Sequence, residues 1–222
     1  MMPVTHYRLG NMFFGEVPKL YNLQLAQYFF TYAAYPIIGD VPEFAHYQLS
    51  RVLFIEGSFD ASLREAQREL EAFPENKRTY YILGLTYGYM SREAEAIESF
   101  SKFIEAYPES WAARNDKAWL QFRIGDLDGA IATMFPIKDH RNAWVQNTYG
   151  TLLLNKGELD EAKQAFLLAQ EVVSSLSEES WGSAYPGNDP RVYAAGLSAM
   201  RQSIADNLTL LESKDISTQE SL

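Results

Sequence analysis

Histidine is the side chain best suited to acid–base chemistry or metal binding at neutral pH, and this sequence has three: His6, His46 and His140. No two of them have the spacing of a metal site, and no HExxH motif is present. The chain has no cysteine, which excludes disulfides, thiolate ligands and cysteine nucleophiles. No Ser/His/Asp set can be assembled from the sequence without guessing. We therefore expect a protein that is not an enzyme, with no cofactor and no metal.

Two other stretches resemble ligand-binding motifs without completing them. "GDLDGA", residues 125–130, has the aspartates of a calcium loop but lacks the downstream glutamate that such a loop requires. Gly84 and Gly88 form neither a GxGxxG fingerprint nor a phosphate loop, and they lie inside a predicted helix. The sequence predicts that residues 125–130 are a turn between two helices.

The composition is globular and acidic. A hydrophobic fraction of 47% is enough for a sizeable core, and the net charge of -10 repels phosphate backbones, so we expect no nucleic acid partner. Residues 1–17 lack the pattern of a secretory signal, which favours a cytoplasmic location. The apolar residues 28–38 are too short to span a bilayer and contain Pro36, so we expect a buried helix and no membrane insertion. It stays open whether the chain is the soluble part of a longer anchored protein.

The elements that position any site are indicated by "YYILGLTYGYM", residues 80–90. Tyr80, Leu83, Gly84 and Tyr87 have the spacing of one helical face. Ala96, Phe100 and Pro108 follow at the distances of a second helix and the turn after it. With Tyr80 in place of Trp, this is the pattern W-x2-L-G-x2-Y, A-x3-F, P. Residues 77–110 therefore resemble a tetratricopeptide repeat.

The same frame recurs in tandem, in a degenerate repeat at residues 3–42 and then at 43–76, 77–110, 111–142 and 143–176. The resemblance implies an all-α fold, a right-handed α-solenoid of about five helix-turn-helix repeats in a single domain over residues 3–212. We expect Pro136 to shorten the second helix of residues 111–142. A loop at 177–189, a capping helix at 190–212 and a flexible tail at 213–222 complete the predicted chain.

In the tetratricopeptide repeat family, the first helix of each repeat lines a concave groove that binds peptides. The resemblance therefore implies a protein or peptide partner, contacted from one face of each first helix. The asparagine amides suit an extended backbone, and the arginines suit acidic side chains or a terminal carboxylate. The alternative for each aromatic residue is that it packs the helix against its neighbours. The groove residues implied in this way are Tyr7, Asn11, Phe14, Tyr47, Arg51, Phe54, Arg78, Tyr81, Leu85, Tyr89, Asn115, Trp119, Phe122, Arg123, Trp144, Asn147, Thr151 and Asn155.

These patterns predict a non-enzymatic scaffold or adaptor that binds a segment of another protein in the groove. The lysine-containing clamp that chaperone-binding members of the family use is absent. The alternative function is a structural subunit that self-assembles or joins a membrane-associated complex, because an apolar first repeat can form a homo-oligomer.

Overall fold

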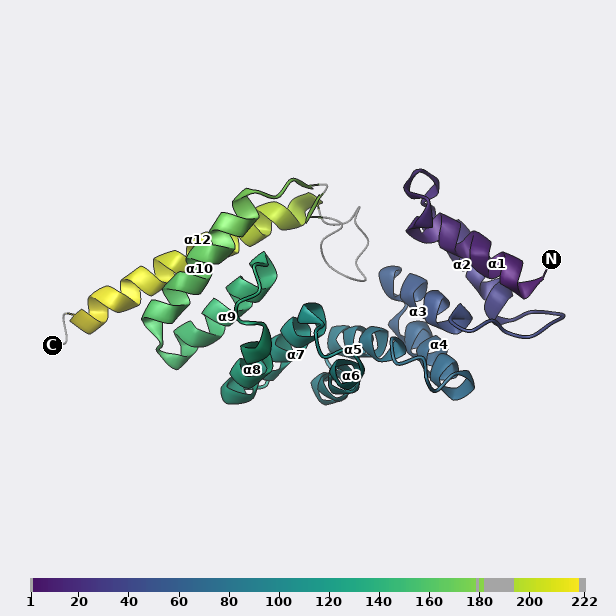
Figure 1. The fold of residues 1–222 in the computed structure, drawn as a ribbon, viewed down its shortest axis with the longest axis horizontal. Coiled ribbons are helices and arrows are strands. Elements are labelled where there is room, and N and C mark those ends of the chain that lie inside the picture. Colours follow the sequence, from purple (N-terminus) through teal and green to yellow (C-terminus); the bar gives the residue numbers. More distant parts are fainter. Residues whose placement is uncertain (1, 179, 182–193, 220–222) are drawn as a thin grey trace. The chain divides into compact units, whose positions relative to one another are not determined.

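The computed structural model describes residues 2–178, 180–181 and 194–219, and all the regular structure within these ranges is helical (Figure 1). The prediction of an all-α fold is confirmed. Two compact units, Met1–Ala106 and Tyr107–Leu222, make up the chain. Its α-helices are α1 (Pro3–Asn11), α2 (Leu23–Ala34), α3 (Ala45–Ile55), α4 (Phe59–Ala72), α5 (Thr79–Tyr89), α6 (Glu93–Ala106), α7 (Trp111–Arg123), α8 (Leu127–Met134), α9 (Ala143–Lys156), α10 (Leu159–Ser174) and α12 (Ala194–Gln219).

The N-terminal unit consists of three helix pairs. Helices α1 and α2, α3 and α4, and α5 and α6 pack against each other, and successive pairs meet through α2–α3 and α4–α5 contacts. Phe30 and Phe100 are 0% and 1% exposed and fill the spaces inside the first and third pairs. A single pair cannot bury its apolar face, so the stacking of neighbours supplies the rest of the core.

The turn inside the first pair is longer than the turns inside the other pairs. It contains a π-helical segment at Met12–Glu16 and a 3₁₀ turn at Pro18–Leu20. The Asn22 Oδ1 accepts a hydrogen bond from the Leu25 N–H at 3.0 Å and starts α2. This turn places Phe14 beside α3, which matters for the site described below.

Left-handed residues end the first helix of four pairs. Gly57, Gly125 and Gly157 have φ values of 77°, 86° and 88°, and Ser91 occupies the corresponding place after α5 with a φ of 56°. A glycine adopts this conformation without a Cβ penalty, so the spacing of these glycines marks the turns.

The C-terminal unit contains the pairs α7–α8 and α9–α10, with α12 packed on α10. Helix α8 ends at Met134 and continues as a single 3₁₀ turn, Phe135–Ile137. The predicted shortening at Pro136 is confirmed, because proline has no N–H for the helical ladder. Asp126 caps α8 through the Gly129 N–H at 3.0 Å. Residues 125–126 therefore belong to the turn between α7 and α8, whereas residues 127–130 of the predicted turn form the first turn of α8.

Helix α12 covers the end of this unit with an apolar stripe. Leu197, Ile204 and Leu211 are 2%, 1% and 2% exposed. The Arg201 Nη2 donates to the carbonyls of Val173 and Leu176 at 3.2 and 3.1 Å, which satisfies the last turn of α10.

The limits of the predicted capping helix and tail differ from the structure. The predicted start at residue 190 and most of the predicted loop at 177–189 lie outside the described residues. At the other end, α12 continues to Gln219, so residues 213–219 are helical where a flexible tail is expected. The physical reason is that no glycine or proline follows Gly196, and nothing in the sequence stops the helix.

Candidate functional site

Arg51 is the centre of a polar and aromatic cluster on the first helices of the N-terminal unit. Its guanidinium carbon lies 4.7 Å from the centroid of the Phe14 ring and 5.7 Å from that of Tyr47. The Arg51 Nη1 donates to the Gln48 Oε1 at 2.9 Å, and the Gln48 Nε2 donates to the Asn11 Oδ1 at 2.8 Å. The turn after α1 and the helix α3 therefore hold one planar cation between two rings. We call these five residues the Arg51 cluster.

The charge of Arg51 is not neutralised by the described part of the chain, where no carboxylate pairs with it. Only one of its N–H groups donates to a described residue, Gln48. A guanidinium has five N–H donors in a fixed plane and matches a carboxylate in a bidentate geometry. The side chain is half-buried, so part of it is open to solvent.

A buried carboxylate fixes the start of α3 and so the direction of Tyr47 and Arg51. Glu69 on α4 is 0% exposed, and its Oε1 accepts from the Phe44 N–H at 2.7 Å and from the Asn76 Nδ2 at 2.9 Å. Its Oε2 accepts from the Tyr47 N–H at 3.1 Å. A negative charge at the first turn also complements the helix dipole.

A second network, centred on the buried pair His46 and Glu65, joins the end of α2 to α3 and α4. The His46 Nδ1 lies 2.7 Å from the Glu65 Oε2, and the Glu65 Oε1 accepts from the Tyr35 hydroxyl at 2.6 Å and from the Arg68 Nη1 at 2.7 Å. Arg68 also contacts the Tyr35 hydroxyl. His46 is 7% exposed and lies between α2 and α4, so it fastens the helices together and has little contact with solvent.

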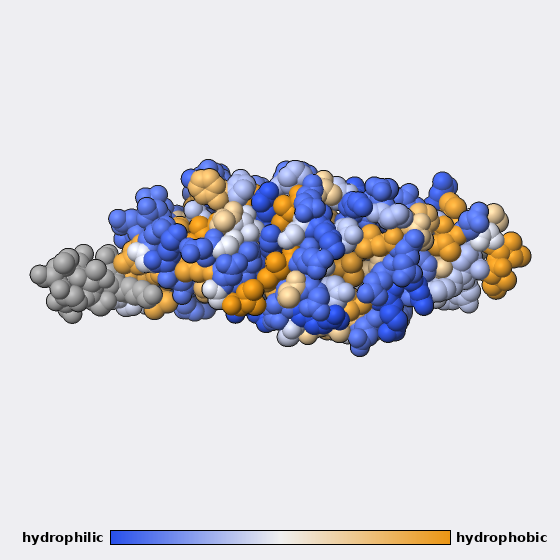
Figure 2. Space-filling view, turned by 90° about the horizontal axis from the view of Figure 1, so that it is seen from below, coloured by the Kyte–Doolittle hydropathy of each residue, from blue (hydrophilic) through white to orange (hydrophobic). Residues whose placement is uncertain are grey.

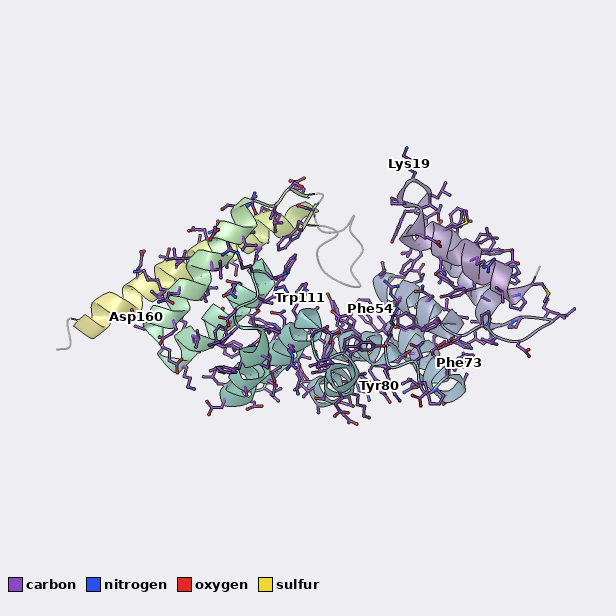
Figure 3. All side chains as sticks on the ribbon, in the orientation of Figure 1. Lys19, Phe54, Phe73, Tyr80, Trp111 and Asp160 are labelled. Carbon is purple, nitrogen blue, oxygen red and sulfur yellow. The ribbon has the colours of Figure 1, made fainter. Side chains whose placement is uncertain are left out.

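The predicted residues on α5 and the end of α3 divide between core and surface. Phe54, labelled in Figure 3, is only 9% exposed and packs on Phe59 and Tyr89 at centroid distances of 5.7 and 5.1 Å. Tyr81 packs on Phe100 and Phe103 of α6 at 5.6 and 5.2 Å. Phe54 and Tyr81 therefore contribute largely to packing.

Some of the predicted residues of the same region lie at or near the surface. Tyr89 is 63% exposed, Arg78 is exposed just before α5, and Leu85 is half-buried against the same core. In the N-terminal unit the structure thus groups Tyr47 with Arg51 and Phe54 with Tyr89.

In the C-terminal unit the predicted residues are partly used by the chain itself. The Asn147 Oδ1 accepts from the Asn207 Nδ2 of α12 at 3.1 Å, and the Asn155 Nδ2 donates to the Thr151 carbonyl of its own helix at 2.8 Å. Asn115 is 6% exposed. Helix α12 therefore covers part of the surface of α9.

Trp119 and Arg123 on α7 are exposed, as is Asn155 at the end of α9. Trp119 is 44% exposed and lies 5.6 Å from Phe122 between ring centroids. A partner that contacts the C-terminal unit would therefore reach α7 more readily than Asn147.

Sequence reasoning missed Gln48, Glu69 and Asn207. Gln48 directly follows Tyr47 on the same helix, so its position next to a predicted groove residue was a usable signal. Glu69 extends the buried face of α4 that Ser62 and Ala66 begin, at helical spacing. Asn207 had no local signal, because its partner lies 60 residues away.

Burial shifts the pKa of two side chains on the helices of the candidate surface. Burial raises the pKa of Glu56 at the end of α3 and the pKa of Tyr149 in α9. Among the described residues no group of three or more His, Asp or Glu could hold a metal ion. None of the helices in the described ranges is long and apolar enough to cross a membrane.

Two models of the Tetratricopeptide repeat family match the chain, one at residues 83–134 and one at residues 145–172. No curated protein sequence matches it. Among solved structures, "MamA RS-1 ArsTM double mutant" is 16% identical with a TM-score of 0.65, over 77% of this chain and 96% of that chain. "MamA AMB-1 P212121" is 19% identical with a TM-score of 0.62, over 79% and 93%.

"MamA MSR-1 C2" is also 19% identical, with a TM-score of 0.61 over 77% of this chain and 95% of that chain. At these identities the three likenesses show a shared fold. The two family models, together with the paired helices and the glycine-to-phenylalanine contacts inside them, show that the chain contains tetratricopeptide repeats.

Proposed function

We propose that the protein is a non-enzymatic scaffold that binds a segment of another protein on the first-helix surface of its N-terminal unit, with the Arg51 cluster holding a carboxylate of that segment. The observation that carries this proposal is the half-buried guanidinium of Arg51. It is stacked between Phe14 and Tyr47 and has no carboxylate partner in the described residues.

The negative net charge of the chain makes the Arg51 cation a selective site for acidic ligands. In a chain with a net charge of -10, most of the surface repels an acidic ligand. An unpaired arginine held between two rings offers a local site of opposite sign, and little side-chain entropy remains to be lost on binding. An acidic side chain or a terminal carboxylate supplies the matching bidentate acceptor.

The neighbouring side chains suit an extended peptide. Asn11 and Gln48 carry amide groups that can pair with a peptide backbone, and Tyr47 and Phe14 offer aromatic surface beside them. No arrangement of nucleophile and base accompanies this cluster among the described residues, which favours binding over catalysis.

The test is selection from a random peptide library on the wild-type protein, followed by fluorescence anisotropy of the selected peptides. We expect the selected sequences to carry a carboxylate, and Arg51→Ala to weaken their binding by at least about tenfold, the loss of roughly one charge-assisted hydrogen bond. Arg51→Lys tests the planar geometry and should also weaken binding. Arg64→Ala, which removes an exposed arginine on α4, is the matched control. Peptides that bind all three variants as well as the wild type would overturn the proposal.

A second function, self-assembly, is favoured by a different observation. Nine of the large apolar side chains that the structure exposes lie in residues 2–38, a small part of the chain. Exposed apolar surface that is concentrated in this way commonly marks an association site.

A further inference from the structure

The loop between α2 and α3 carries the most exposed apolar side chains of the described residues. Ile37 is 92% exposed and Ile38 is 79% exposed. Tyr28 and Tyr32 on α2 are 52% and 42% exposed, and their rings lie 4.7 Å apart. Figure 2 shows orange, hydrophobic surface over this N-terminal part of the molecule, at the right of the view. We call these four residues the Ile37 patch.

A pocket of about 330 Å³ opens within the same surface. It is lined by His6, Tyr32, Pro36, Ile37 and Ile38. The His6 and Tyr32 rings stack at a centroid distance of 5.5 Å, and the His6 Nδ1 is buried with no hydrogen-bond partner in the structure. The pocket therefore has a mostly apolar lining, and one of its lining residues carries a buried polar atom without a partner.

The loop is held in place at both ends, so its apolar tip is presented on a fixed base. Tyr35 donates its hydroxyl proton to Glu65, and the Phe44 N–H donates to the buried Glu69. In the middle, Gly39 has a φ of 95°, and a Cβ atom there would lie 3.3 Å from the Pro3 ring, so the loop lies against the start of α1. Ile37 and Ile38 thus stay exposed although the backbone on either side is anchored.

We propose that a second copy of this chain binds at the Ile37 patch, with Ile37 of each copy entering the pocket of the other. Ile37 is itself one of the residues that line the pocket, so the protruding side chain and the pocket share one surface. A two-fold axis through such a surface makes both contacts at once, as an isologous dimer requires. This inference rests on the self-assembly proposed above; it uses none of the residues of the Arg51 cluster and does not depend on that cluster.

The size and charge of the Ile37 patch fit a second copy of this chain. From the exposed fractions of its members, the patch offers on the order of 500 Å² of mostly apolar surface, the size at which such patches mark interaction sites. A standard interface buries about 800 Å² per partner, so a polar rim must supply the rest. Arg8 on α1 and Asp40 and Glu43 on the loop between α2 and α3 are exposed charged residues of the same unit.

The patch itself contains no charged side chain, which lets two chains of net charge -10 meet there without burying like charges.

The test is sedimentation velocity of the full chain from the micromolar to the millimolar range. We expect the wild type to dimerise reversibly and Ile37→Asp to weaken dimerisation by more than about tenfold, because a charge would enter an apolar pocket. Leu167→Asp is the matched control, since Leu167 is 47% exposed on α10 in the other unit. Circular dichroism is used to check that each variant is folded.

A second measurement uses the absence of cysteine from the chain. Ile38→Cys should be joined into dimers by a short bis-maleimide reagent, whereas Phe135→Cys, at a side chain that is 59% exposed in the C-terminal unit, should stay monomeric. Arg51→Ala should dimerise like the wild type, which separates this inference from the proposed function.

Three outcomes would overturn the inference. One is a wild type that stays monomeric at all concentrations, and another is a dimer that Ile37→Asp leaves intact. The third is a monomer that binds phosphatidylcholine vesicles through Ile37, which would assign the patch to a lipid surface.

Discussion

A Cβ atom added to Gly84 would lie 2.8 Å from the Phe100 Cε1, so these two residues bring α5 and α6 together with no space for a methyl group. The same relationship joins Gly150 with Phe166, at 2.7 Å, in the other unit. The glycine and the phenylalanine lie on the two helices of one pair. The spacing of the glycine and the phenylalanine in the sequence therefore reflects the contact between the two helices.

Gly84→Ala should destabilise the protein by about 1–3 kcal/mol, because Phe100 is 1% exposed and cannot move aside without disturbing the core. Urea unfolding followed by circular dichroism measures the change. The double variant Gly84→Ala/Phe100→Leu provides the check, since the smaller leucine makes room for the new methyl group. The double variant should lose less stability than the sum of the two single losses, and strict additivity would contradict the contact.

Glu69→Gln should cost about 1.5–3 kcal/mol, the range for a hydrogen bond to a charged group. The carboxylate accepts from the Phe44 and Tyr47 N–H groups and from the Asn76 amide, and glutamine would turn one acceptor into a donor that faces other donors. Urea unfolding again gives the free energy. Glu71→Gln, at an exposed position of the same helix, is the control and should change little. If the two variants were equally stable, Glu69 would not have the capping role that its hydrogen bonds indicate.

Much of the fold could be predicted because it rests on local repetition. Tyr80, Leu83, Gly84 and Tyr87 define a helical face from spacing alone, and Pro136 marks the end of α8 from its missing N–H. The extent of α12 was harder to predict, because its apolar stripe ends at Leu211 while the helix continues to Gln219. Beyond Leu211, only the lack of a glycine or proline in the sequence indicates that the helix continues.

The candidate site could be predicted only in part. The frame of the repeat placed Tyr47 and Arg51 on the same helix, and the structure brings their side chains together. The repeat frame could not show that the Phe54 side chain lies in the core, because a small rotation of α3 determines whether this side chain is buried or exposed. Nor could it show that Asn207 reaches Asn147, because that contact depends on how α12 packs. The residues of the groove as a whole stay a prediction.

The stability of the protein should depend on pH through Glu56. Burial raises the pKa of this carboxyl above its ordinary value of 4.5, so the folded state binds its proton more tightly than the unfolded chain does. Stability is then greatest while Glu56 is protonated, and it falls as the pH rises from the ordinary value through the raised one.

Glu56→Gln removes this loss and keeps an oxygen that can accept from the Gln27 Nε2, which lies 2.8 Å from Glu56 in the wild type. We expect the variant to be more stable than the wild type at pH 7, and the difference to shrink as the pH approaches 4.5. Urea midpoints measured across this range test it, with Glu71→Gln as the exposed control. A difference that stays constant with pH would exclude Glu56 as its source.

Helix α12 should contribute to stability through the side chains that it buries, and Ile204→Ala should cost about 2–5 kcal/mol. Ile204 is 1% exposed and packs into the cluster that also contains Trp181 and Val173, so truncation leaves a cavity there. Leu210→Ala on the same helix is the matched control, since Leu210 is 48% exposed and its loss should stay within about 0.5 kcal/mol. Thermal or urea unfolding separates the two variants. If both variants unfolded like the wild type, α12 would not be packed on α10 in solution, and the surface of Asn147 on α9 would be open to a partner.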